Sequence, residues 1–254
     1  METLLEVKDI SKTFREKDGH LFKALDHVSL TVNKGECIAL IGESGSGKST
    51  LARVITNLVK PDQGSVSLNG RNITCLRGKD LREVYRDMKM IFQEPRSSFD
   101  PRLTLGKSMD EALKEYVKNP AERLNRELKC LDQVGLDSHF LKLYPHEISG
   151  GECQRSAIAR ALVQNPKLLI CDEATSSLDV SVQAEIISLL REIQKKENLA
   201  ILFISHDIAL VSQFCDRIYV MHEGRIIEEG MTENIINEPE ENYTKKLIEA
   251  AVNL

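Results

Sequence analysis

The residues best suited to chemistry form one glycine-rich stretch, residues 42–50, which reads GESGSGKST. Its spacing fits G-x-x-x-x-G-K-[S/T], and it lies between a short apolar run and an amphipathic stretch, the context this pattern needs. Glycines let the backbone curl so that successive N–H groups point at phosphate oxygens, and a helix that begins there adds the positive end of its dipole. The stretch predicts a phosphate-binding loop made of Gly42, Glu43, Ser44, Gly45, Ser46, Gly47, Lys48, Ser49 and Thr50.

Two side chains of this loop have distinct expected roles. Lys48 is expected to reach the β- and γ-phosphates of a nucleotide, and the Ser49 hydroxyl is expected to hold Mg²⁺. The alternative is a plain turn, rich in glycine and serine, between a strand and a helix. The flanking patterns favour nucleotide binding over that alternative.

A pair of carboxylates follows an apolar run further along the chain. Residues 168–173 read LLICDE, so a predicted strand ends in Asp172 and Glu173. Beside a phosphate loop, Asp172 can orient the Mg²⁺ shell and Glu173 can polarise a water for in-line attack on the γ-phosphorus. Such a strand end is also common as an ordinary solvated end, but its order after the loop favours the catalytic interpretation. Cys171 is expected to be a small buried hydrophobe.

A second anion-binding pattern lies between these two motifs. Ser149, Gly150 and Gly151 directly precede a predicted helix, and a turn of this kind can also hold an anion. Two anion-binding turns in one chain would be unusual for a simple kinase. They make sense if the second device serves a nucleotide that another subunit holds.

The hydrophobic pattern predicts an α/β core with a helical insertion. Alternation and short apolar runs predict strands in the N-terminal third, at 4–10, 28–32, 37–41, 65–68 and 88–92, and a helix at 48–59. Residues 103–134 are helical in pattern, with a break at Asn119-Pro120. From residue 152, helices (152–164, 180–196, 208–214) alternate with strands (168–171, 200–204, 217–221), which predicts a mostly parallel sheet.

Composition excludes several classes of protein. The chain has 254 residues, 41% of them hydrophobic and 29% charged, and its net charge of −5 argues against nucleic-acid binding. Its six cysteines are scattered, which favours a reducing compartment over zinc binding. No secretory signal is expected, and the apolar runs are far shorter than the roughly 20 residues that span a bilayer. We therefore expect a cytoplasmic protein that reaches membranes only through a partner.

Together these motifs resemble the ATPase domain of ABC proteins over nearly the whole chain. The phosphate loop, Gln93 after a strand, SGG at 149–151, LLICDE, SSLD at 176–179 and ISHD at 204–207 occur in the family's order and spacing. The resemblance implies an α/β P-loop NTPase (RecA-like) core with a mostly parallel sheet, an N-terminal antiparallel β part and a helical insertion. It implies one domain over 1–254: a core at about 1–93 and 156–232, a helical subdomain at about 94–155 and a helical tail at about 233–254.

The resemblance also implies ATP and Mg²⁺ as ligands and assigns roles to single residues. Glu173 is expected to be the catalytic base, with Gln93 and His206 acting on the γ-phosphate and Gln93 also on Mg²⁺. Phe14 looks like the aromatic that stacks on adenine, although a core aromatic is the alternative. Residues 149–151 would close over a partner's ATP, and Asp179 would couple the two sites. One departure is Glu152, where the family has a neutral glutamine, so its contact with nucleotide stays open.

Three segments, 94–113, 172–187 and 238–252, resemble ATPases of peptide, dipeptide and nickel importers. The compact form, ending at Leu254, favours the nickel or metal–metallophore type within that group. The resemblance implies a peripheral subunit at the cytoplasmic face of the cell membrane. Its expected partners are a second, different ABC ATPase, two membrane-spanning permease subunits and an external substrate-binding protein.

Other classes fit less well. A tandem ABC factor would carry two phosphate loops, a chromosome-maintenance ATPase would replace the helical insertion with a long coiled coil, and a small-molecule kinase or GTPase would lack SGG and the histidine of ISHD. A stand-alone ABC accessory of metabolism, for example in phosphonate breakdown, is the alternative that stays open.

Overall fold

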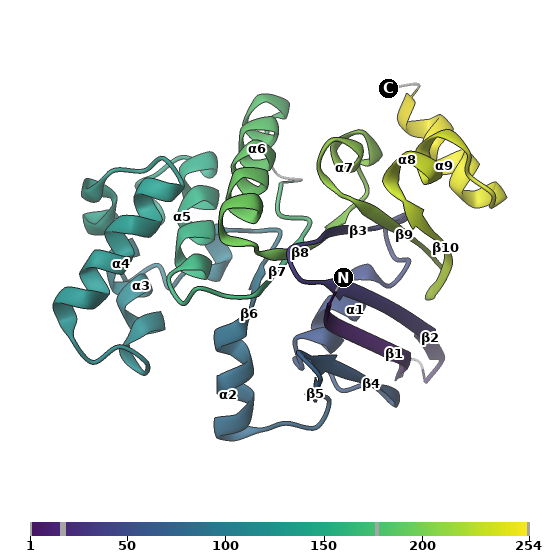
Figure 1. The fold of residues 1–254 in the computed structure, drawn as a ribbon, viewed down its shortest axis with the longest axis horizontal. Coiled ribbons are helices and arrows are strands. Elements are labelled where there is room, and N and C mark those ends of the chain that lie inside the picture. The colour runs from purple at the N-terminus through teal and green to yellow at the C-terminus, as the bar shows by residue number, and fades with distance from the viewer. Residues whose placement is uncertain (1, 16–18, 176–177, 253–254) are drawn as a thin grey trace.

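The computed structural model describes residues 2–15, 19–175 and 178–252, and its strands form two sheets (Figure 1). The first sheet is antiparallel, with strand order β2-β1-β4-β5. Its strands are β1 (Thr3–Arg15), β2 (Leu21–Asn33), β4 (Gln63–Leu68) and β5 (Arg71–Asn72). The predicted antiparallel N-terminal part is confirmed.

The second sheet has six strands in the order β10-β9-β3-β8-β7-β6 and is parallel except for β10. The strands are β3 (Cys37–Ile41), β6 (Met88–Ile91), β7 (Leu168–Asp172), β8 (Ala200–Ser205), β9 (Arg217–His222) and β10 (Arg225–Met231). Every residue of β3, β7 and β8 is buried, as expected for strands covered on both faces. The predicted mostly parallel sheet is confirmed.

Helices cover both faces of the second sheet. They are α1 (Lys48–Ile55), α2 (Gly78–Asp87), α3 (Leu105–Lys114), α4 (Pro120–Gln133), α5 (Gly150–Leu162), α6 (Val180–Glu197), α7 (Ile208–Phe214), α8 (Thr232–Asn237) and α9 (Asn242–Val252), with short 3₁₀ turns at Arg96–Ser98 and Ser138–Lys142. Figure 1 shows α3 and α4 at one end of the molecule and α8 and α9 at the other. Within the described ranges, no helix combines the length and the apolar character needed to cross a bilayer.

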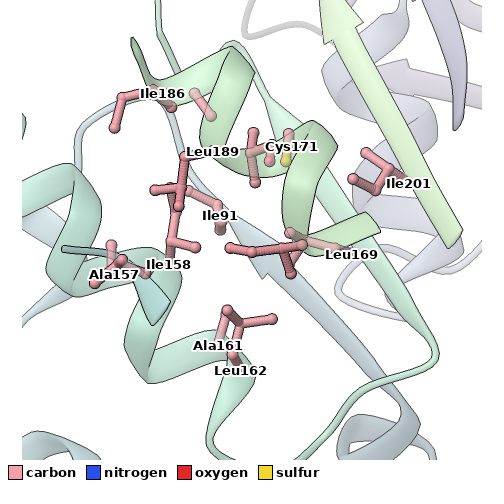
Figure 2. Packing of buried hydrophobic residues seen from close by; sticks show 14 of the residues in the cluster. Ile91, Ala157, Ile158, Ala161, Leu162, Leu169, Cys171, Ile186, Leu189 and Ile201 are labelled. Carbon is pink, nitrogen blue, oxygen red and sulfur yellow. The ribbon is translucent and has the colours of Figure 1, made fainter. Parts of the chain in front are cut away.

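Alternate residues of the central strands build two separate cores. Ile38 and Leu40 of β3 face a cluster that also contains α1 and the antiparallel sheet. Ala39 and Ile41 face the opposite cluster, formed with α5, α6 and α7. Figure 2 shows this second core, where residues of α5 and α6 pack over strands β6 and β7. Because each face is buried, the ends of the strands are held rigidly at one edge of the sheet.

Helix α5 complicates the predicted division of the chain near residue 155. It contacts α3 and α4 of the helical part and also β6 and α6 of the core, so it joins the two parts. The boundaries at 93/94 and 155/156 therefore stay predictions. Arg160 of α5 further ties the two parts together, because its guanidinium donates to the carbonyl of Ser98, 2.7 Å away.

The structure also contains elements that the pattern did not predict. Helix α2 has one buried residue, Val84, so its apolar stripe is too thin to be recognised. Strand β10 follows a two-residue turn at Glu223 and Gly224, and each of its residues is half-buried or exposed. Helix α1 ends at Ile55 rather than at residue 59, because Asn57 adopts a left-handed conformation (φ 58°).

Candidate functional site

The loop between β3 and α1 depends on glycine at two crowded positions. Gly42 and Gly47 have φ of 150° and 108°. A Cβ atom at Gly42 would lie 2.1 Å from the carbonyl oxygen of Met221, and one at Gly47 would lie 2.5 Å from that of Ala24. The loop therefore packs against neighbouring backbone so closely that side chains at these positions are excluded.

Lys48, at the start of α1, points back into this loop. Its side chain is buried (4% exposed), and Nζ donates to the carbonyl oxygens of Gly42 and Glu43, each 2.8 Å away. Burial lowers the pKa of Lys48, while the nearby carboxylates of Glu173, Asp172 and Glu43 act in the opposite direction. The loop thus holds a cation at its centre, where phosphate oxygens could replace the two carbonyls.

The next residue connects the loop to the end of β7. Ser49 Oγ donates to Asp172 Oδ1 at 3.0 Å. Burial raises the pKa of Asp172, whereas the hydrogen bond from Ser49 and the cations Arg53 and Lys48 lower it. Hydroxyl and carboxylate oxygens are the hard donors that Mg²⁺ prefers, so this pair fits a magnesium ion.

A cleft of about 420 Å³ opens beside this pair. Gln93, from the segment after β6, lines it together with Ser49 and Asp172, so the structure brings all three predicted magnesium-site residues into one cleft. The full lining is Ser49, Arg53, Phe92, Gln93, Glu94, Ser97, Ser98 and Asp172. Arg53 was missed from the sequence, although it lies one helical turn after Ser49.

Glu173 has a strained backbone at the predicted catalytic position. Its φ of 49° is uncommon for a residue other than glycine, and its N–H donates to the carbonyl of Ile204 at 3.0 Å. This bond ties the end of β7 to β8, which leads directly into His206. His206 Nδ1 lies 3.7 Å from Glu173 Oε1, so the two predicted catalytic side chains are neighbours.

The far side of the loop is fastened by the C-terminal quarter of the chain, which the sequence did not predict. Gly224 N–H, in the turn between β9 and β10, donates to the carbonyl of Ser46 at 3.0 Å. Tyr243 Oη, on α9, accepts from Glu43 N–H at 3.0 Å. No sequence pattern links such distant positions.

Ser149 and Glu152 form a capping box at the start of α5. Glu152 N–H donates to Ser149 Oγ, and Glu152 Oε2 accepts from both the N–H and the hydroxyl of Ser149, at 2.8 and 2.7 Å. These hydrogen bonds lower the pKa of Glu152. Ser149 and Gly150 are exposed, and in the part of the chain that the structure describes, residues 149–152 do not line the cleft at Ser49.

Two further predicted residues lie apart from the cleft lining. Phe14 is 38% exposed on β1, directly across from Phe22 on β2, and Lys12 Nζ lies 5.5 Å from the centre of its ring. Its exposure argues against the core-aromatic alternative. Asp179 caps α6 by accepting from Val182 N–H at 3.0 Å. Ser176 and Ser177 of the SSLD motif lie outside the described residues.

Comparison with known proteins identifies close relatives. A family model described as ABC transporter matches residues 25–176. The oligopeptide transport ATP-binding protein OppF of Streptococcus mutans is 42% identical over 249 residues, which cover 97% of this chain and 81% of the relative. OppF of Escherichia coli is 40% identical over 259 residues, covering 98% and 78%.

Solved structures match the fold over a similar extent. CbiO1 of Clostridium perfringens, part of the ABC transporter complex CbiONQ, has a TM-score of 0.83 at 29% identity, covering 94% of this chain and 92% of its own. The ATP-binding cassette MJ0796, in a dimeric post-hydrolysis state bound to ADP and Pi, has a TM-score of 0.80 at 30% identity, covering 90% and 99%.

Proposed function

This chain belongs to the ABC transporter family, and from that premise we propose how its site works and what its importer carries. The chain is the ATP-binding and hydrolysing subunit of an importer. We propose that the cargo is peptide and that the site is built around Lys48, Ser49 and Asp172. The observation that carries the proposal for the site is the hydrogen bond from Ser49 to Asp172 beside the buried Lys48 ammonium.

The residues around this bond have complementary tasks in ATP binding. Lys48 exchanges its two carbonyl partners for the β- and γ-phosphate oxygens. Ser49, Asp172 and Gln93 would hold Mg²⁺, which when bound neutralises charge on those oxygens. The loop amides from Ser44 to Thr50 and the start of α1 stabilise the remaining charge, and Phe14 stacks on adenine.

Hydrolysis then needs a base and a group that senses the γ-phosphate. Glu173 accepts a proton from a water molecule as the water oxygen attacks the γ-phosphorus, and ADP leaves on the opposite side. His206 donates a hydrogen bond to the γ-phosphate. Because His206 lies next to Glu173, both side chains can contact the γ-phosphate and the attacking water at the same time. The hydrogen bond from the Glu173 N–H to the Ile204 carbonyl supports this role, because it fixes the backbone of Glu173 against the strand that leads into His206.

A complete site is proposed to need a second subunit. Ser149, Gly150 and Gly151 are exposed or half-buried at the start of α5, as residues that bind a partner's ATP must be. Asp179 would lie between the two sites and couple them. The partner is proposed to be a different ABC ATPase, and both would dock on two permease subunits at the cytoplasmic face of the membrane.

The relatives named for oligopeptide transport support a peptide cargo. The preference for nickel or a metal–metallophore stays a prediction. One experiment distinguishes a peptide cargo from a metal cargo. A tagged chain is purified from membranes, and the external binding protein of the same system is screened by thermal shift against peptides, Ni²⁺ and metal chelates. Two co-purified permeases and a shift with peptides are expected. Recovery without any membrane subunit would favour the stand-alone accessory instead.

A further inference from the structure

Among the contacts of the phosphate loop that nucleotide chemistry does not require, one is made by a side chain far along the chain. The hydroxyl of Tyr243, in the C-terminal helix α9, accepts a hydrogen bond from the N–H of Glu43 at 3.0 Å, across 200 positions of sequence. The carbonyl of the same residue accepts from Lys48 Nζ at 2.8 Å. Glu43 is thus held from both sides, by Tyr243 at its N–H and by Lys48 at its C=O.

ATP changes only one of these two contacts. When Lys48 turns to the phosphates, the carbonyl of Glu43 loses its ammonium partner. The contact with Tyr243 involves no group that binds phosphate in the proposed site, so it can persist. In the part of the chain that the structure describes, the Tyr243 hydroxyl then still holds the Glu43 end of the loop, while the N–H of Gly224 holds the Ser46 end.

Tyr243 is itself held firmly enough to serve as an anchor. Its ring lies on that of His222, with the centroids 3.9 Å apart and the planes inclined by 30°. About one turn of helix further on, Leu247 and Ile248 pack against the core shared with α7. Just before α9 begins, the Glu228 carboxylate on β10 accepts from Glu240 N–H at 2.8 Å. The hydroxyl is therefore presented to the loop by a docked helix rather than by a free tail.

We propose that Tyr243 is a positioning residue for ATP, which keeps the phosphate loop in its binding shape and couples the loop to the docking of α9. The proposal rests on the proposed function only in taking ATP as the ligand of the loop. Coupling between two sites is reciprocal. If α9 stabilises the ATP-binding loop, ATP must in turn stabilise the docked α9.

The variant Tyr243→Phe tests the first half, because it keeps the ring on His222 and removes only the hydroxyl. The matched control is Tyr116→Phe, since the Tyr116 hydroxyl donates to the carbonyl of Arg82, also at 3.0 Å, but between the helical part and α2. We expect the Kd for ATP to rise about five-fold in Tyr243→Phe, which corresponds to about 1 kcal/mol. In steady-state assays its KM should rise more than its kcat falls, and Tyr116→Phe should leave both unchanged.

Amide hydrogen exchange tests the second half and separates positioning from a merely structural role. ATP is expected to slow exchange in α9 of the wild-type protein, and to do so much less in Tyr243→Phe. A Kd within two-fold of wild type, or an α9 response to ATP that is equal in both proteins, would overturn the proposal. If Tyr243→Phe does not fold, the wild-type measurement is sufficient: hydrogen exchange in α9 that ATP does not slow would overturn the proposal. A wild-type chain that does not bind ATP would instead overturn the proposed function.

Discussion

Ser49 and Asp172 are 123 positions apart in the sequence, yet the hydroxyl of one donates to the carboxylate of the other at 3.0 Å. The bond exists because β3 and β7 both pair with β8 as parallel strands, so their carboxyl ends meet at one edge of the sheet. Ligands of open α/β sheets bind at this edge. A loop that cradles phosphate and a strand that ends in carboxylates thereby form a single site.

The variant Asp172→Asn tests this pair as a magnesium site. An amide can still accept from Ser49, but it removes the negative charge that would hold the ion. We expect the Mg²⁺ concentration for half-maximal ATPase activity to rise at least ten-fold, measured by Mg²⁺ titration at fixed ATP. The control is Asp87→Asn. The Asp87 carboxylate pairs with Lys167 at 2.7 Å and is not part of the cleft lining. An unchanged Mg²⁺ requirement in Asp172→Asn would remove Asp172 from the magnesium site.

The variant Glu152→Gln should make the second half-site bind ATP more tightly. The Glu152 carboxylate accepts the hydroxyl hydrogen of Ser149 at 2.7 Å, so a negative charge lies where a partner's γ-phosphate is expected to approach. Glutamine removes the charge and can still cap α5. We expect the ATP concentration for half-maximal association of the assembled ATPase pair to fall several-fold, as measured by light scattering.

A nearby carboxylate provides the control for this effect. Glu147 also accepts a backbone N–H, that of Tyr144 at 2.7 Å, but it lies before the helix. Glu147→Gln should leave association unchanged. If Glu152→Gln associates no better than wild type, the charge at residue 152 does not limit closure.

Glu127 should make stability depend on pH. It is buried on α4, and burial, with a smaller contribution from Asp110, raises its pKa to about 7 from a usual 4.5. The folded state then binds more protons than the unfolded state between these values, so the free energy of unfolding falls as pH rises from about 4.5 to 7 and levels off above. The free energy of unfolding of Glu127→Gln should therefore increase relative to that of the wild type as the pH rises from 5 to 8, by on the order of 2 kcal/mol.

Urea unfolding at the two pH values measures this difference. Glu122→Gln, an exposed position on the same helix, serves as the reference and should show no such pH-dependent gain. A constant difference between Glu127→Gln and wild type across this range would mean that Glu127 titrates normally in the folded protein.

The sequence predicts the centre of the sheet well and its periphery poorly. The strand at 37–41 was predicted with the bounds observed, because a continuous apolar run is what a strand buried on both faces requires. Helix α2 was missed because a single residue, Val84, is buried. Strand β10 was missed because none of its residues is fully buried, so no clear alternation of buried and exposed positions marks it.

The candidate site divides in the same way. The residues of the loop, together with Asp172 and Gln93, were found from motifs that have a fixed order, and the fold brings them together. The left-handed backbone of Glu173 and the reach of Tyr243 to Glu43 depend on tertiary packing, which no local pattern encodes. The bond of Glu152 to Ser149 follows from a capping-box spacing that the sequence does contain.

The most direct test of the account is the hydrolysis of ATP by Glu173→Gln. The amide keeps the size of the side chain and can still contact His206, but it cannot accept a proton from the attacking water. ATP should bind with a Kd close to that of the wild type, while single-turnover hydrolysis should slow at least 100-fold. Hydrolysis at the wild-type rate with normal ATP binding would contradict the role of Glu173 as the base, and with it the mechanism proposed for this site.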